Sequence, residues 1–278
     1  MSDGLFKRFG PFIKGCELPK CVIRIFETTE DAGFLFEGPA FSVFSDAVSN
    51  EGSQCVFRVN EYRFAPCGDG VAVWCDQPVW AWVHDGFSYI EVVVKRPFQL
   101  TEGFFAVIMR AYQYAALHGG ALLMHSAAVA YGGEGLLFCG VPGAGKSTQA
   151  KLWRGHLGAE AINNDQPCIV YKAGRAFVSG SPWSGKEPCY KNLCVPARAI
   201  VFVEKSAENR IEKVSSAEAY GLLYLNEYVV PVRPETEREY DAAIRRLVSC
   251  VPVLRQYCTK TEEAPATLAA FLENELGA

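Results

Sequence analysis

Short segments that alternate between hydrophobic and polar positions fill the first hundred residues, a pattern typical of half-buried β-strands. The clearest of them cover residues 21–26, 56–60, 71–74, 79–83 and 89–94. Asp85 and Gly86, between the last two, form a hairpin signal. We therefore predict a mostly β N-terminal region over residues 1–98. Trp74, Trp80 and Trp82 fall at alternating positions, which favours one face of a sheet over a ligand-binding surface.

The pattern changes to a helical period after residue 100. Pro97 marks the boundary, and Thr101 is a suitable helix N-cap. Apolar side chains at helical spacing predict a helix over residues 103–117, which Gly119 and Gly120 would end. We place a second domain at residues 99–278.

Longer apolar runs and helical segments share the rest of the chain. Strands are expected at residues 122–130, 136–139, 168–171, 176–178, 199–204 and 253–258, with 210–214 as the neighbour of 199–204. Helices are expected at residues 146–156, 216–228, 234–250 and 261–276. This mixture predicts an α+β or α/β fold class with a mixed sheet for the second domain.

One glycine-rich stretch, which follows the expected strand 136–139, has the spacing G-x-x-x-x-G-K-[ST] of a phosphate-binding loop. Its residues are Gly140, Val141, Pro142, Gly143, Ala144, Gly145, Lys146, Ser147 and Thr148. Glycines let successive backbone N–H groups point at phosphate oxygens, and the following helix adds its positive N-terminus. The loop is expected to bind a nucleotide or another polyphosphate: Lys146 would contact the β- and γ-phosphates, and the Ser147 hydroxyl would ligate Mg²⁺. The structural alternative is a glycine turn that binds nothing.

Composition narrows the class of partner. The net charge is −4 and no long basic run occurs, which argues against nucleic acid as a partner. No apolar stretch has the length of a membrane span, and the N-terminus lacks a signal peptide. The 11 cysteines are odd in number and contain no C-x-x-C pair. We therefore expect a cytoplasmic protein without a disulfide framework.

From His125 onward the chain resembles the catalytic domain of HPr kinase/phosphorylase, which is related to ATP-dependent phosphoenolpyruvate carboxykinase. The resemblance rests on residues 123–127 around His125, on the glycine loop, and on Asp165, nineteen residues after Lys146. Residues 196–202 and 253–258 look like a divergent branch of this family, and the likeness covers roughly residues 121–275. It implies a phosphoenolpyruvate carboxykinase-like P-loop core.

The resemblance also implies roles for the side chains. Asp165 looks like the base that accepts the proton of an incoming hydroxyl, and His125 matches a histidine near the γ-phosphate; with Lys146 they form the candidate catalytic set. Asp165 could instead contact the metal through water or cap a turn, and His125 could be structural. Asn164 stands where the family has a first aspartate. The loss of that carboxylate weakens the case for phosphorylase activity.

The glutamate-glycine signature of HPr kinases does not appear, and residues 181–186 stand in its place. Lys186 there could contact phosphate or acceptor, or the segment could be a rigid surface loop. Glu204 follows a strong strand and could reach a metal, but it is expected to be solvated. Arginines on the C-terminal helices are candidates for contacting phosphates; these are Arg233, Arg238, Arg245 and Arg246.

The sequence thus favours an ATP- and Mg²⁺-dependent kinase that phosphorylates a hydroxyl, with Ser of a peptide or small protein as the acceptor. The alternatives are a nucleotide-binding regulatory or scaffold protein without turnover, and a small-molecule kinase. GTP and pyrophosphate stay open as donors, and so does the oligomeric state.

Overall fold

The computed structural model of the chain describes residues 7–12, 21–28, 57–84, 86–96, 99–185, 187–226 and 229–276. The predicted positions Val56, Asp85 and Pro97 lie outside these ranges. The backbone contacts divide the chain into two compact units. Unit 1 comprises Met1–Gly4, Pro19–Gly120 and Val229–Asp241, and unit 2 comprises Leu5–Leu18, Ala121–Tyr228 and Ala242–Ala278.

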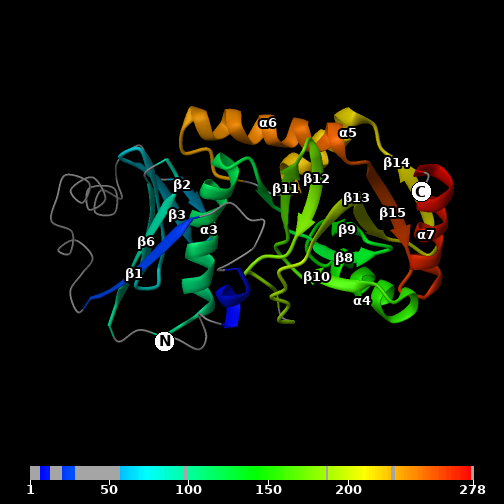
Figure 1. Cartoon of the computed structure of the whole chain (residues 1–278), viewed down its shortest axis with the longest axis horizontal. Helices are drawn as coiled ribbons and strands as arrows, with labels where there is room; N and C mark the ends of the chain where they lie inside the picture. Colours follow the sequence, from blue (N-terminus) through cyan, green and yellow to red (C-terminus); the bar gives the residue numbers. More distant parts are fainter. Residues whose placement is uncertain are drawn as a thin grey trace. The chain divides into compact units, whose positions relative to one another are not determined.

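Unit 1 contains a six-stranded sheet in the order β1-β6-β5-β4-β3-β2 (Figure 1). The strands are β1 (Val22–Thr28), β2 (Phe57–Val59), β3 (Tyr62–Cys67), β4 (Gly70–Cys75), β5 (Val79–His84) and β6 (Tyr89–Lys95). β1 pairs with β6 in parallel, and the other neighbours are antiparallel. The predicted β-rich N-terminal region is therefore present in the described residues.

Helix α3 (Glu102–His118) packs on β4, β5 and β6 of this sheet, close to the predicted span of 103–117. Thr101 caps it as predicted, because its hydroxyl accepts a hydrogen bond of 3.2 Å from Phe104 N. Phe104, Val107 and Ile108 are each fully buried. The helix belongs by its contacts to unit 1, whereas the sequence placed the boundary before it, at residues 98/99.

The three tryptophans of unit 1 share one face of the sheet. Trp74 pairs with Trp80 across β4 and β5, and Ala72 pairs with Trp82, so all these side chains point the same way. Trp74 and Trp82 lie in one buried cluster with Cys67. This agrees with the prediction of a sheet face.

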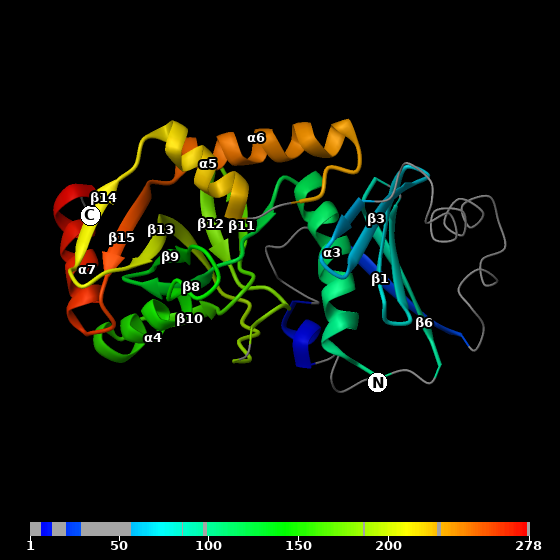
Figure 2. The same ribbon diagram turned by 180° about the vertical axis from the view of Figure 1, so that it is seen from behind.

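Unit 2 contains a sheet that is mixed, as predicted; its described part has nine strands, and the main path runs β10-β8-β9-β13-β12-β11-β7 (Figure 2). Its strands are β7 (Leu122–Leu123), β8 (Ala127–Tyr131), β9 (Glu134–Cys139), β10 (Glu160–Asn163), β11 (Cys168–Lys172), β12 (Arg175–Ser179), β13 (Cys194–Lys205), β14 (Arg210–Lys213) and β15 (Val253–Cys258). The sheet is mixed at β13, which pairs antiparallel with β12 and parallel with β9 and β15.

Two strand predictions in unit 2 were wrong. β14 pairs with β15 rather than with β13, because β15 lies parallel to β13 and occupies that side. The expected single strand 122–130 is two strands, since β7 pairs with β11 and β8 pairs with β9 and β10. The chain changes pairing partners between them, and His125 lies in that connection rather than on a strand.

Helices α4 (Lys146–Leu157) and α7 (Glu263–Leu276) lie side by side over the sheet of unit 2 (Figures 1 and 2). Trp153 of α4 and Leu268 of α7 are fully buried in one cluster with Phe138 of β9. This packing fixes the start of α4 relative to the end of β9. The described residues also contain a 3-10 helix (Gly10–Phe12), α5 (Ser216–Asn226) and α6 (Pro234–Cys250), and the division between the units falls within α6.

Candidate functional site

The glycine loop of residues 140–145 joins β9 to α4, in the predicted strand-loop-helix context. Gly140, Gly143 and Gly145 adopt φ values of 136°, 80° and 117°, which favour glycine. At Gly140 space is also limiting, because a Cβ there would lie 3.1 Å from Val203 O. Gly145 precedes α4 without a side-chain cap. The first N–H groups of that helix are thus arranged as in anion-binding helix termini.

Lys146 opens α4 and turns its ammonium group back onto the loop. Its Nζ donates to Gly140 O at 2.8 Å and to Val141 O at 3.4 Å. Partial burial lowers the pKa of Lys146, and the nearby Asp165 carboxylate acts in the opposite direction. The Lys146 ammonium group thus contacts the backbone of its own loop.

Asp165 lies in the turn that follows β10, and buried Asn163 shapes this turn. The Asn163 Oδ1 accepts hydrogen bonds from Asp165 N at 2.9 Å and from Gln166 N at 2.8 Å. Its Nδ2 donates to Trp183 O at 2.9 Å. Asn163 is fully buried, so the position of the Asp165 backbone is set by an enclosed hydrogen-bond network. β8 lies between β10 and β9, so Asp165 follows the second strand from the glycine loop rather than the adjacent one.

His125 approaches Asp165 from the connection between β7 and β8. Its Nδ1 lies 3.7 Å from Asp165 Oδ1 and 3.3 Å from Gln166 Nε2. The side chains of His125 and Asp165 are 41% and 36% exposed, so both groups are accessible to a substrate. The structure thus brings His125 and Asp165 together from two segments of the chain.

Asn226, the last residue of α5, connects two of these segments. Its Oδ1 accepts from Gly140 N and its Nδ2 donates to His125 O, each at 3.4 Å. The side chain therefore holds the first glycine of the loop and the backbone of His125 in a fixed relation. No spacing or composition signal in the sequence indicated Asn226.

The segment after β12 supports Asp165 from another side. A Cβ on Gly185 would lie 3.3 Å from the Asp165 Cβ, so only a residue without a side chain fits there easily. Asn164 Nδ2 donates to Glu187 O at 3.1 Å, and the Glu187 carboxylate forms an ion pair with Lys151 of α4. The predicted Lys186 lies outside the described residues. Asn164, which stands in place of a carboxylate, is thus used to hold this loop.

The predicted metal ligand Ser147 lies exposed in the first turn of α4, and Thr148 follows it with intermediate exposure. Within the described ranges, no group of three or more His, Cys, Asp or Glu side chains could hold a metal ion. Mg²⁺ commonly uses few protein ligands and takes the rest from phosphate oxygens and water. A single hydroxyl at the start of α4 fits that donor set.

The other polar candidates have partners elsewhere. Glu204, which was expected to be solvated, has a side chain that is 41% exposed and also forms an ion pair with Arg255. Arg246 lies 3.7 Å from the centre of the Tyr171 ring, and Arg245 lies 5.0 Å from that of Tyr220. In unit 1, Arg238 pairs with Glu235 and Arg233 donates to a backbone oxygen. Each of the four arginines thus has a contact outside the glycine loop.

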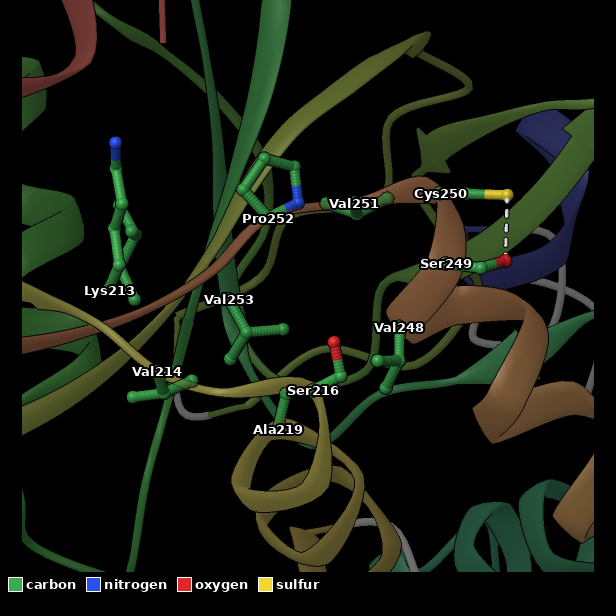
Figure 3. Close-up of a pocket in the computed structure, with 11 residues that line it drawn as sticks. Lys213, Val214, Ser216, Ala219, Val248, Ser249, Cys250, Val251, Pro252 and Val253 are labelled. Atoms are coloured by element: carbon green, nitrogen blue, oxygen red, sulfur yellow. Dashed lines mark hydrogen bonds between the residues drawn. The ribbon is translucent and has the colours of Figure 1, made fainter. Parts of the chain in front are cut away.

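A cavity of about 400 Å³ in unit 2 lies at a different place. Its walls come from β14, the start of α5, the end of α6 and β15, and Ser216 and Val248 lie close to each other among the residues that line it (Figure 3). Cys250 and Ser249 lie at one edge, 3.7 Å apart between Sγ and Oγ. None of the predicted catalytic or phosphate-binding residues lines this cavity.

Several cysteines belong to the buried core. Cys139 and Cys168 are fully buried, and no disulfide joins cysteines within the described ranges. Burial raises the pKa of the Cys258 thiol to about 11, so it stays protonated and packs as a small apolar group. None of the helices described for this chain is long and apolar enough to cross a membrane.

Comparisons with known proteins add little to this geometry. No protein-family model matches the chain, and no curated protein matches it. Among solved structures, the HPr(Ser) kinase/phosphatase from Coxiella burnetii aligns at 12% identity and a TM-score of 0.33. The alignment covers 55% of this chain and 90% of that chain. Identity and TM-score this low do not transfer an activity, so the functional conclusion depends on the site geometry.

Proposed function

We propose that this protein is an ATP- and Mg²⁺-dependent kinase with a phosphoenolpyruvate carboxykinase-like P-loop core, which transfers the γ-phosphoryl group to a hydroxyl. Ser of a peptide or small protein is the proposed acceptor. One observation carries the proposal: three separate segments meet at one place, because His125 Nδ1 lies 3.7 Å from Asp165 Oδ1 and Asn226 links the His125 backbone to Gly140 of the glycine loop.

In this proposal the glycine loop and the start of α4 hold the triphosphate. The backbone N–H groups of residues 140–145 and the Lys146 ammonium neutralise negative charge on the β- and γ-phosphates. Ser147 would hold Mg²⁺, which supplies further positive charge on the phosphate oxygens.

Asp165 would act as the general base. The acceptor oxygen forms a bond to the γ-phosphorus while the bond from that phosphorus to the β,γ-bridging oxygen breaks, and ADP leaves. The proton of the acceptor hydroxyl passes to the Asp165 carboxylate. His125, beside Asp165, would donate a hydrogen bond to the phosphoryl group.

Two substitutions test this assignment. We expect Lys146→Ala to weaken ATP binding by about 10- to 100-fold, because it removes a charge-assisted contact to phosphate. We expect Asp165→Asn to bind ATP within about 2-fold of wild type but to transfer phosphate at least about 100-fold more slowly. Calorimetry with ATP and Mg²⁺ measures the first effect. Transfer of label from [γ-³²P]ATP to a Ser-containing peptide library measures the second.

Glu208→Gln is the matched control for Asp165→Asn, because Glu208 is an exposed acid of the same unit. It should change neither binding nor transfer. An Asp165→Asn protein that labels the library at the wild-type rate would show that another group is the base. A library with Ala in place of Ser should stay unlabelled if Ser is the acceptor.

A nucleotide-binding regulatory protein without turnover is the second candidate. Asn164 favours it, since a neutral amide replaces a carboxylate and is hydrogen-bonded to Glu187 O at 3.1 Å. This candidate predicts ATP binding that depends on Lys146 but no labelled product from proteins, peptides or small alcohols. Labelled small alcohols with unlabelled peptides would instead indicate a small-molecule kinase.

A further inference from the structure

The pairing of β7 with β11 continues beyond the end of β7. Leu123 pairs with Cys168 in the antiparallel register. Two backbone hydrogen bonds extend it, from Met124 N to Pro167 O at 2.8 Å and from Ser126 N to Asp165 O at 2.9 Å. The residues between these two bonds, His125 and Gln166, are therefore directly opposite each other, and their side chains share one face.

The Gln166 side chain contacts the imidazole of His125. Gln166 is only 4% exposed, and its Nε2 lies 3.3 Å from His125 Nδ1. Asp165 Oδ1 lies 3.7 Å from the same nitrogen, beyond hydrogen-bond range. Nδ1 is thus hydrogen-bonded to Gln166 and interacts with Asp165 only through its charge.

This contact determines where the imidazole carries its proton. A neutral imidazole has one nitrogen that donates and one that accepts. Because the Gln166 amide N–H donates to Nδ1, the proton of the neutral ring is on Nε2. The ring then has an N–H group on the side opposite Gln166, where it can donate to an oxygen of a substrate.

The oxygen of the Gln166 amide indicates that this side chain does not serve to stabilise the fold. Its Oε1 is buried, and within the described part of the chain it has no hydrogen-bond partner. Such an oxygen is a cost that a leucine of similar size would avoid. The contact with His125 is the gain that offsets it.

We propose that Gln166 is a positioning residue that holds His125 in the Nε2–H tautomer. His125 then donates Nε2–H to the phosphoryl group, and Asp165 is left available to accept the proton of the acceptor. The catalytic consequence rests on the proposed kinase function, whereas the tautomer is a property of the protein without nucleotide.

The test is the ¹⁵N spectrum of the imidazoles in long-range ¹H–¹⁵N correlation, on the full chain without nucleotide at about pH 8.5, where histidine is neutral. The chain has four histidines, and His125→Gln assigns the signals of His125 by their loss. We expect His125 Nδ1 to show the shift of an unprotonated nitrogen and Nε2 that of a protonated one.

Gln166→Leu should convert this single tautomer into a mixture, and Gln166→Glu should reverse it, because a carboxylate only accepts and would favour Nδ1–H. For Gln166→Leu we also expect kcat about 10-fold lower with KM for ATP within about 2-fold. Gln256→Leu is the control, since Gln256 is fully buried in the same unit and donates to Ala264 O at 3.1 Å. It should leave the His125 signals unchanged.

A protonated Nδ1 in the wild-type protein would overturn the proposal. So would Gln166→Glu with the wild-type tautomer, in a variant whose other imidazole signals show that it is folded. If the tautomer is as expected but no phosphoryl transfer is found, the kinase assignment fails and the role of Gln166 toward His125 stands.

Discussion

Replacing the buried Asn163 should reduce both the stability of unit 2 and phosphoryl transfer, because its side chain holds the backbone of Asp165. Asn163→Ala removes the acceptor of two backbone N–H groups, of Asp165 and Gln166, and the donor to Trp183 O. Each lost hydrogen bond costs about 1 kcal/mol, and more where a buried group is left without a partner. Three bonds at a fully buried position give a loss of about 3–5 kcal/mol in the free energy of unfolding.

Thermal unfolding and phosphoryl transfer measure the two consequences. For a domain of this size about 1 kcal/mol corresponds to 2–4 °C, so the midpoint of unit 2 should fall by about 6–20 °C. The rate of phosphoryl transfer should fall toward that of Asp165→Asn, because the Asp165 carboxylate is no longer held in position. The double variant Asn163→Ala, Asp165→Asn should be little slower than Asp165→Asn alone.

Two variants show which contacts matter. Asn163→Asp keeps an acceptor for the two N–H groups but places a carboxylate oxygen against Trp183 O at a fully buried position, so it should destabilise the fold at least as much as alanine. Asn164→Ala, at the next position, removes one hydrogen bond of an exposed side chain and should cost about 1 kcal/mol or less. If Asn163→Ala unfolds and transfers phosphate like the wild type, Asn163 does not position Asp165.

Three further outcomes are expected from the glycine loop. Burial lowers the pKa of Lys146 below the usual value of 10.5, and ATP binds the protonated form. As the pH is raised, ATP affinity should therefore start to fall before pH 10.5 is reached. Lys146→Arg should keep a flat profile in the same titration. Gly140→Ala should destabilise the fold by about 1–3 kcal/mol in urea unfolding and weaken ATP binding, because Gly140 has a φ of 136° and a Cβ there would lie close to Val203 O. Gly132→Ala is the control, since a Cβ at Gly132 would meet open space. Equal effects of the two substitutions would contradict the steric argument. Asn226→Ala should reduce ATP affinity about 3- to 10-fold, and its neighbour Leu225→Ala, at an 80% exposed position, should not; similar affinities for both would exclude a role for Asn226.

The local features of the fold could be predicted because their causes are local. Thr101 caps α3 with its own hydroxyl, and the spacing of Gly140, Gly145 and Lys146 placed a loop between a strand and a helix. Helical and alternating periods gave the spans of α6 and β15 almost to the residue.

Strand pairing was missed because it depends on segments far apart in the chain. The apolar pattern of residues 122–130 does not indicate that β7 pairs with β11 while β8 pairs with β9, so His125 was expected on a strand. The same holds for β14, whose neighbour β15 follows some forty residues later. Asn163, Gln166 and Asn226 act only through such long-range contacts, and for this reason the sequence did not identify them.

The distance from the Asp165 carboxylate to the γ-phosphorus, in a crystal structure with a non-hydrolysable ATP analogue and Mg²⁺, tests the central claim most directly. A reacting hydroxyl lies about 3–3.5 Å from phosphorus and about 2.6–3.2 Å from its base. We therefore predict the γ-phosphate on the glycine loop beside Lys146 and a carboxylate oxygen no more than about 6.5 Å from the phosphorus. A γ-phosphate bound elsewhere, or a carboxylate turned away beyond that distance, would contradict the account.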